Sequence, residues 1–318
     1  MRAALLAVLS VVSLGAVSEV PAAARPPHEV AVTFDDLVQG GPELPLARIQ
    51  ALNAKLLAGL ARHRMPAAAF VNESKLYREG EVDARLALLR AWRDAGVELG
   101  NHTFSHLSLH KTALEAVEED VVRGDAVTRL LLAEKGAKPR WFRHPFLQTG
   151  PTPGTKAAFE SFLSAHGYRV APVTIDTNDW MFNVPFTDAR SRGDDAAGAR
   201  VRDAYLAYVA QMLDFYEDLE RRVFGRPIRH VVLFHANELN ADTIDAWAAL
   251  LAGRAYSFVT LDRALADPAY ASADTFISAQ GISWLHRWLY TRTGATRLKQ
   301  EPDPPDFVQK AYAALKKS

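Results

Sequence analysis

The sequence contains no cysteine in its 318 residues. Without cysteine the chain can form no disulfide and can offer no thiolate to a metal ion, so any metal site must consist of histidine, aspartate or glutamate side chains. An excess of charge of either sign is also lacking, because Lys plus Arg and Asp plus Glu both number 37. This balance argues against nucleic acid as a partner, since proteins that neutralise phosphates normally carry a basic surface.

The N-terminal apolar stretch is shorter than the ~20 residues that a membrane-spanning helix needs. It begins after Arg2, continues to Val17 and is followed by the small residues of Pro21-Ala22-Ala23-Ala24. A basic start, a short apolar region and small residues before a break are typical of a secretory signal peptide. We therefore expect residues 1–24 to be a signal peptide, the mature protein to be periplasmic or secreted, and no stable membrane anchor to remain after cleavage.

The remainder, residues 25–318, alternates between short apolar runs and amphipathic stretches, and this pattern predicts parallel strands in one α/β domain. Seven such units favour an incomplete (β/α) barrel of about seven parallel strands, with an open sheet as the alternative. We expect an aromatic, helical extension over residues 263–318 to pack against the barrel. The predicted strands are 29–32, 66–71, 97–100, 140–143, 168–175, 229–234 and 256–259, and the predicted helices are 46–62, 82–95, 112–134, 155–165, 196–223 and 241–252.

Two neighbouring carboxylates, Asp35 and Asp36, follow the first predicted strand. The carboxyl edge of the sheet is where α/β proteins usually place their chemistry. Like charges held close together push their pKa values apart, so one carboxylate can bind a cation while the other accepts a proton. An Asp-Asp pair alone is more often a polar loop or a helix cap, so a functional interpretation requires partners elsewhere in the chain.

Histidines follow the third predicted strand in the segment from His102 to His106. Histidines four residues apart lie on one face of a helical turn and can reach one ion. His106 and His110 have the same spacing, so either pair is possible. Two histidines and one carboxylate from the first strand suit Zn²⁺, which lowers the pKa of its bound water to about 7. Non-haem iron uses the same ligand types, so iron-dependent oxygenation is an alternative.

Three further strand ends carry polar side chains: Arg143 after the fourth strand, the segment 176–180 after the fifth and His235 after the sixth. In a barrel they would all converge on one mouth. With the aspartates and histidines they supply a base, a metal triad, an orienting cation and an acid. This set fits metal-assisted hydrolysis better than oxygenation, which needs no paired base and acid.

In this order the segments resemble the five motifs of the polysaccharide deacetylases, the NodB-homology enzymes of carbohydrate esterase family 4. The resemblance spans roughly residues 29–262, and five ordered motifs are far more specific than any single one. The motif segments are Thr33-Phe34-Asp35-Asp36, His102-Thr103-Phe104-Ser105-His106, Arg143-His144-Pro145-Phe146, Asp176 through Trp180, and Leu233-Phe234-His235.

The resemblance implies a distorted (β/α) barrel that hydrolyses acetyl groups from an acetylated poly- or oligosaccharide. A divalent metal, most often Zn²⁺ with Co²⁺ or another first-row ion possible, would activate a water that attacks the acetyl carbonyl. By this resemblance Asp35 is the base, which Arg143 orients, and His235 is the acid, whose acidity Asp179 adjusts. The implied metal ligands are Asp36, His102 and His106. Trp180 would form part of the substrate groove, and the Phe146 N–H would donate to the oxyanion.

The sequence departs from the family pattern at several positions. Leu37 follows the aspartates where the family usually has Gly-Pro, Phe146 stands where it often has Tyr, and the segment 181–229 is long. These departures leave the predicted catalytic set intact but bear on the shape of the groove and hence on the substrate. Two alternatives follow: hydrolysis of a small non-carbohydrate amide or other C–N bond, and a non-catalytic carbohydrate-binding protein on the same scaffold. The sequence makes no prediction of sugar, linkage or oligomeric state.

Overall fold

The computed structural model of the chain describes residues 28–295 and 301–316. The predicted signal peptide, residues 1–24, lies outside the described residues. Within the described ranges, no helix combines the length and the apolar character needed to cross a membrane.

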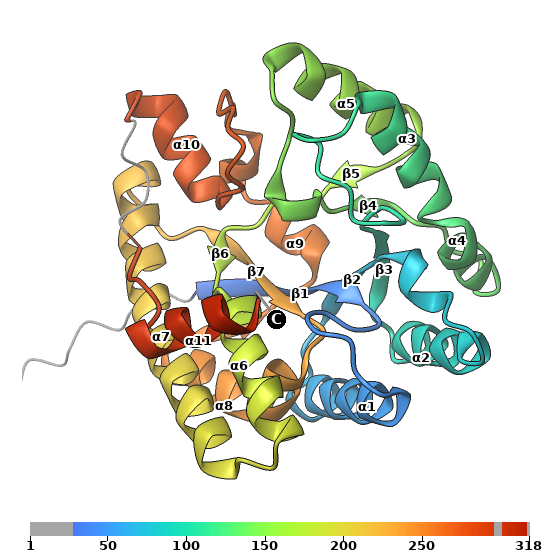
Figure 1. Ribbon diagram of the computed structural model, residues 1–318. Coiled ribbons are helices and arrows are strands. Elements are labelled where there is room, and N and C mark those ends of the chain that lie inside the picture. Colours follow the sequence, from blue (N-terminus) through green and yellow to red (C-terminus); the bar gives the residue numbers. More distant parts are fainter. Residues whose placement is uncertain (1–27, 296–300, 317–318) are drawn as a thin grey trace, which may run out of the picture.

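A curled sheet of parallel strands forms the centre of the molecule, as the sequence predicted (Figure 1). The strand order is β5-β4-β3-β2-β1-β7-β6, and β8 also pairs with β1. The described residues form eight strands because the predicted strand 168–175 is divided in two. The strands are β1 (His28–Leu37), β2 (Ala67–Val71), β3 (Glu98–Asn101), β4 (Trp141–Phe142), β5 (Arg169–Val170), β6 (Ile175–Asp176), β7 (Arg229–His235) and β8 (Tyr256–Phe258).

The barrel is incomplete between β5 and β6, the two ends of the strand order. The chain itself crosses this opening. Ala171 donates its N–H to Phe142 O on one side, and Thr174 donates to Val231 O on the other. A segment that bonds to both edges in turn cannot be one continuous strand, which explains why the predicted strand 168–175 is divided.

Helices surround the sheet (Figure 1). Most follow their strands as predicted, because their apolar stripes pack on the sheet. The α-helices are α1 (Leu46–His63), α2 (Val82–Asp94), α3 (Leu114–Arg123), α4 (Ala126–Ala133), α5 (Pro153–Ala165), α6 (Asp179–Ser191), α7 (Asp195–Phe224), α8 (Glu238–Gly253), α9 (Leu261–Leu265), α10 (Trp284–Thr293) and α11 (Asp306–Leu315), and three short 3₁₀ helices are η1 (Glu73–Leu76), η2 (Pro145–Leu147) and η3 (Pro268–Ala271).

One predicted helix was wrong in its extent: residues 112–134 form two helices, α3 and α4, which are separated at Gly124. A Cβ atom on Gly124 would lie 2.5 Å from the backbone nitrogen of Phe104, so only glycine allows the histidine-bearing loop to approach here. Phe104 also donates its N–H to Asp120 O near the end of α3. The break therefore serves the loop that carries His102 and His106.

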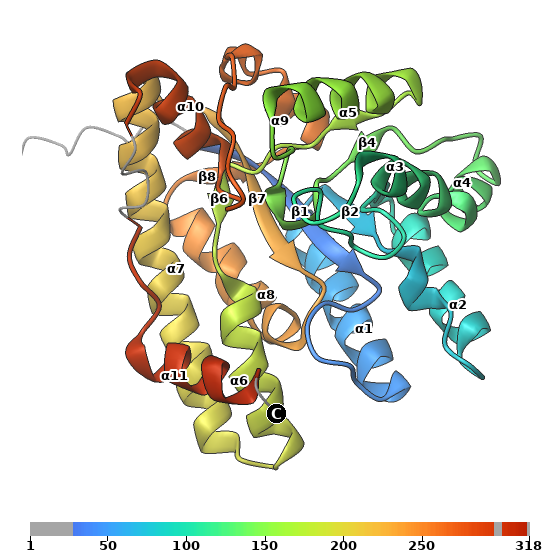
Figure 2. The same cartoon turned by 45° about the horizontal axis from the view of Figure 1, so that its top comes forward.

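The C-terminal helices pack against the barrel. Trp284 and Trp288 of α10 are buried, and Trp284 donates its N–H to Val173 O in the segment that crosses the barrel opening. Helix α11 lies against α6, as both views show (Figure 2). Helix α10 thus covers the gap in the barrel, and α11 lies beside the helix that follows β6.

Candidate active site

Asp35 and Asp36 lie at the carboxyl edge of the sheet, where β1 pairs with β7. In the parallel register Asp35 stands opposite His235. Asp36 adopts a left-handed backbone conformation with φ 67°, and the pairing of β1 with β2 is irregular between Phe34 and Leu37. This turn brings both carboxylates to one side: His102 Nε2 lies 3.7 Å from Asp35 Oδ2 and 3.8 Å from Asp36 Oδ1.

Asp36, His102 and His106 form a group whose ligand atoms are mutually close enough to hold a metal ion. Asp36 Oδ1 lies 3.8 Å from Nε2 of each histidine. His102 Nδ1 lies 2.8 Å from Arg143 O, and a proton on Nδ1 leaves Nε2 free to act as a ligand. Burial lowers the pKa of both imidazoles, which favours the neutral form that binds metals.

The segment between the two histidines is a loop and not the expected helical turn. Thr103 and His106 have positive φ values of 65° and 59°, so the chain turns sharply between the two imidazoles. Asn101 Oδ1 accepts the Thr103 N–H, and Thr103 Oγ1 accepts the His106 N–H. Of the two possible pairs, the structure brings His102 and His106 to Asp36, whereas His110 is absent from this group.

The residues present fit a divalent cation. Asp36 Oδ1 is buried and accepts no hydrogen bond from the described residues, although Lys75 Nζ lies 3.3 Å away. Burial alone would raise the pKa of Asp36, but nearby positive charge, that of Lys75 foremost, outweighs it and lowers that pKa. An ionised carboxylate oxygen that accepts no hydrogen bond from the part of the chain described, beside two imidazole nitrogens, is a donor set that suits Zn²⁺.

Lys75 was not foreseen from the sequence. It lies in η1, directly after β2, and its ammonium donates to Gln39 O at 3.0 Å. This bond ties η1 to the loop that follows the two aspartates. Its position just after a strand was the only feature of the sequence that could have indicated a role in the site. A single lysine at such a position matches no known motif.

Asp35 lies in a drier environment than Asp36. Burial raises the pKa of Asp35 to about 6, against the opposing charge of Arg143. Arg143 is fully buried, with Nη1 3.8 Å from Asp35 Oδ1 and Nη2 donating to Thr33 Oγ1 at 2.9 Å. A carboxylate whose pKa lies near neutrality is suited to take up and release a proton.

His235 and Asp179 form a tightly bonded pair. Asp179 accepts from His235 through Nδ1 at 2.8 Å and through the backbone N–H at 2.9 Å. Asn237 and Asn240 also donate to Asp179 Oδ2, which fixes this buried carboxylate. Burial opposes charge on His235, but Asp179 outweighs that effect and raises the pKa of His235 to about 10. His235 therefore carries a proton at neutral pH.

The two aromatic residues predicted to contact the substrate, Trp180 through its ring and Phe146 through its backbone N–H, lie at the surface. Phe146 is 53% exposed, and its ring packs edge-on against the ring of His106, with 4.3 Å between ring centroids and 73° between the ring planes. Trp180, 36% exposed, follows Asp179 on α6 and contacts the ring of Tyr312 from α11 at 5.2 Å. Helix α11, outside the resembling region, thus contributes to the surroundings of Trp180.

A family model and several solved structures are similar to this chain. Residues 22–170 match the family model described as polysaccharide deacetylase. A carbohydrate esterase family 4 pseudoenzyme from Bacillus anthracis has a similar fold, with 15% identity, a TM-score of 0.50 and coverage of 75% of this chain and 66% of that one. A mutant of that protein with restored enzymatic activity matches at 18% identity, TM-score 0.50, and 75% and 68% coverage. A polysaccharide deacetylase from Bacillus cereus matches at 20% identity and TM-score 0.49, covering 73% and 91%. The chain spans about two thirds of the length of the first two.

Proposed function

The chain belongs to the polysaccharide deacetylase family, and we propose that it is an exported, divalent-metal-dependent hydrolase that removes acetyl groups from a poly- or oligosaccharide. The main support for the proposal is that side chains suited to three different tasks lie together at one edge of the sheet. A donor set for a cation, a buried carboxylate and a protonated histidine lie together there.

Asp36, His102 and His106 would hold the metal. When bound, a divalent cation there supplies a Lewis acid that polarises the acetyl carbonyl and acidifies a water molecule. The Arg143 carbonyl and the Asn101 and Thr103 hydrogen bonds hold the two imidazoles in place for this role.

The proton transfers belong to Asp35 and His235. Asp35 accepts a proton from the attacking water, and Arg143 keeps the carboxylate oriented. His235 gives its proton to the leaving amine nitrogen or alkoxide oxygen as the bond to the acetyl carbon breaks, and Asp179 stabilises the imidazolium beforehand. The Phe146 N–H donates to the developing oxyanion. The products are acetate and a free amine or hydroxyl.

A binding protein without activity is the second candidate, because the same fold occurs in a protein described as a pseudoenzyme. Fold alone therefore does not determine catalysis in this family. The presence of the complete proton-transfer set in this chain favours the enzyme.

Acetate release tests the proposal. The chain, loaded with Zn²⁺, should release acetate from at least one of acetylated chitooligosaccharide, peptidoglycan and acetylated xylan, and a chelator should abolish the release until Zn²⁺ is restored. Release only from small amides would support the non-carbohydrate alternative. Binding of an oligosaccharide without any acetate release, with metal shown to be bound, would support the binding protein.

Export is part of the proposal and rests on the sequence features of residues 1–24. The protein should be exported when it is expressed with this segment and not when it is expressed without it. N-terminal sequencing of the exported protein should locate the cleavage at about residue 24. An uncleaved chain that stays inside the cell would contradict it.

A further inference from the structure

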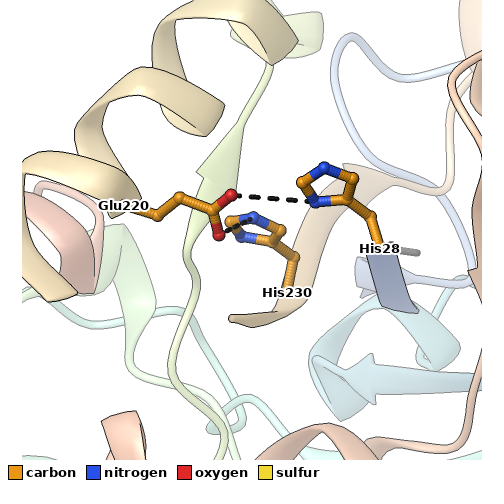
Figure 3. A group of neighbouring side chains, drawn as sticks. All are labelled: His28, Glu220 and His230. Carbon is orange, nitrogen blue, oxygen red and sulfur yellow. Dashed lines mark ion pairs between the residues drawn. The ribbon is translucent and has the colours of Figure 1, made fainter. Parts of the chain in front are cut away.

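A second group of metal-ligand side chains lies at the opposite end of the strands from Asp35. His28 begins β1, His230 is the second residue of β7, and Glu220 comes from the last part of α7 (Figure 3). At about 3.3 Å per residue, the seven residues from His28 to Asp35 span roughly 23 Å. This group is therefore separate from the candidate active site.

The three side chains are buried and face one another (Figure 3). His28 is 3% exposed, and Glu220 and His230 are 0% exposed. His28 Nδ1 lies 3.7 Å from Glu220 Oε1, and His230 Nε2 lies 3.1 Å from Glu220 Oε2. Around a tetrahedral ion with ligand bonds of 2.0–2.1 Å, neighbouring donor atoms are about 3.3 Å apart. One ligand atom from each of the three residues lies within 4.8 Å of the other two, close enough to hold one small cation.

The facing atoms make ion-pair contacts with one another but, among the described residues, no hydrogen bond. His28 Nδ1, Glu220 Oε1 and His230 Nε2 are all buried and have no hydrogen-bond partner within the described part of the chain. A buried polar atom without a partner costs about 1–3 kcal/mol, and three that point at one place are rarely left so. An ion that accepts one lone pair from each would satisfy all three together.

The surroundings orient these side chains for ligation. The Ile228 N–H donates to Glu220 Oε2 at 2.7 Å, and His230 Nδ1 lies 3.2 Å from Thr174 Oγ1, so Nε2 is the nitrogen that faces Glu220. His28 stacks on the Tyr256 ring with 4.8 Å between centroids.

We propose that His28, Glu220 and His230 bind a second divalent cation, Zn²⁺ or an ion of similar preference, which has a structural role. Two imidazoles and one carboxylate are a donor set that Zn²⁺ accepts, and their burial keeps substrate away. The ion links the start of β1, the start of β7 and helix α7. Helix α7 belongs to the long segment 181–229, so the site fastens this segment to the barrel.

Counting bound metal tests the proposal, with the full chain carrying no histidine tag. The His106→Ala substitution removes the expected active-site ion and isolates the second site. After incubation with Zn²⁺ and desalting, His106→Ala should retain about one Zn²⁺ per chain, and the His106→Ala/Glu220→Gln double variant should retain none. Glu217→Gln in the same background is the matched control, because Glu217 is a buried glutamate one turn earlier on α7 but lies outside the group, and it should retain one.

A His106→Ala chain that is folded and binds no Zn²⁺, or a Glu220→Gln double variant that keeps its Zn²⁺, would overturn the proposal. Circular dichroism establishes that each variant is folded. If Glu220→Gln does not fold, adding Co²⁺ to the His106→Ala variant tests instead whether the second site binds a metal ion. A visible absorption band typical of tetrahedral Co²⁺ is expected, together with a higher Tm than in chelator, and the absence of both would refute the second site. Because none of these readouts is activity, they stand independently of deacetylation.

Discussion

Asp35 and Asp36 are neighbours in the sequence, yet their surroundings change their acidity in opposite directions. Burial raises the pKa of Asp35 to about 6, whereas the positive charge of Lys75 is the main cause that holds the pKa of Asp36 below its usual range. Asp36 is thus ionised and ready to bind a cation, and Asp35 can exchange a proton near neutral pH. This difference is the physical basis for assigning them separate roles.

The choice between the two histidine pairs gives a residue-scale prediction. His106→Ala should lose one equivalent of bound Zn²⁺ relative to the wild-type chain, because His106 Nε2 faces Asp36 Oδ1. His110→Ala should lose none, because His110 lies outside both groups of potential ligands among the described residues. Elemental analysis of the desalted proteins measures the difference, and equal losses in the two variants would reopen the choice of ligands.

Asp179 is predicted to act through His235. Asp179→Asn removes the charge that keeps His235 protonated, so the pKa of His235 should fall. We expect kcat to fall on the order of 10²–10⁴-fold and activity to be lost at a lower pH than in the wild type, because the deprotonated imidazole cannot donate. Asp188→Asn, on the same helix but paired with Arg192, is the control and should leave the pH profile unchanged. An unshifted profile in Asp179→Asn would contradict the role.

At this scale the sequence predicted which residues converge, because the carboxyl ends of parallel strands meet at one edge. Asp35, Asp36, His102, His106, Arg143 and His235 all lie there, as does Asp179. The sequence did not predict the contribution of Lys75, since a single lysine has no spacing pattern. The expected helical turn between the histidines was also wrong, because the positive φ of Thr103 and His106 depends on tertiary contacts.

The C-terminal region, which lies outside the barrel, forms hydrogen bonds with the loop that carries Phe146 at the mouth of the barrel. Gln148 Nε2 donates to Ala279 O, and Arg287 of α10 donates to Thr149 Oγ1. These bonds connect the C-terminal region to the loop that carries Phe146. The C-terminal region therefore braces the loop that we expect to supply the oxyanion donor.

Gly281 gives an element-scale prediction. A Cβ there would lie 1.6 Å from Phe146 O, so Gly281→Ala must displace either the Phe146 peptide or the C-terminal loop. Displacement of a catalytic group by about 1 Å can lower the rate on the order of 10²-fold. We expect kcat for acetate release to fall by that order with the bound metal unchanged.

Gly198→Ala is the control for this substitution, because no atom lies within 4 Å of its added Cβ in helix α7. It should leave kcat unchanged and stabilise the chain by roughly 0.5–1 kcal/mol. Unchanged kcat in Gly281→Ala would show that the loop contact does not position Phe146.

Helices whose apolar residues recur with helical spacing were predicted well. Helices that depend on contacts with distant parts of the chain were not. Helix α1, predicted at 46–62, spans Leu46–His63. Helix α6 was not predicted, since it contains Pro185 and begins at Asp179, whose side chain bonds to β7 and α8. Its existence depends on those tertiary bonds rather than on a local pattern.

The molecule as a whole is held together where helices α7 and α8 pack on the barrel. Trp247 of α8 is buried, packs edge-on against Phe234 of β7 at 4.4 Å, and donates to Tyr205 Oη of α7 at 3.3 Å. One side chain thus joins three elements. The apolar stripe on α7 was correctly predicted to be core packing, since Tyr205, Met212 and their neighbours are buried.

Trp247→Ala should lower the free energy of unfolding by ~3–5 kcal/mol, because it leaves a large cavity and removes the hydrogen bond from Trp247 to Tyr205 Oη. Denaturant unfolding followed by far-UV circular dichroism measures the loss. Trp180→Ala should cost less, since the Trp180 ring is partly exposed. A loss as large for Trp180 as for Trp247 would show that the core is not centred on this junction.

The most direct test of the account is acetate release measured together with bound Zn²⁺ in Asp35→Asn and Asp36→Asn. We predict that Asp35→Asn keeps its full metal content but loses activity on the order of 10²-fold or more, because it cannot accept the proton. Asp36→Asn should lose both the active-site ion and activity, because it removes the carboxylate that faces both imidazoles. An Asp35→Asn chain that releases acetate at the wild-type rate would contradict the central claim that these neighbours divide proton transfer and metal binding between them.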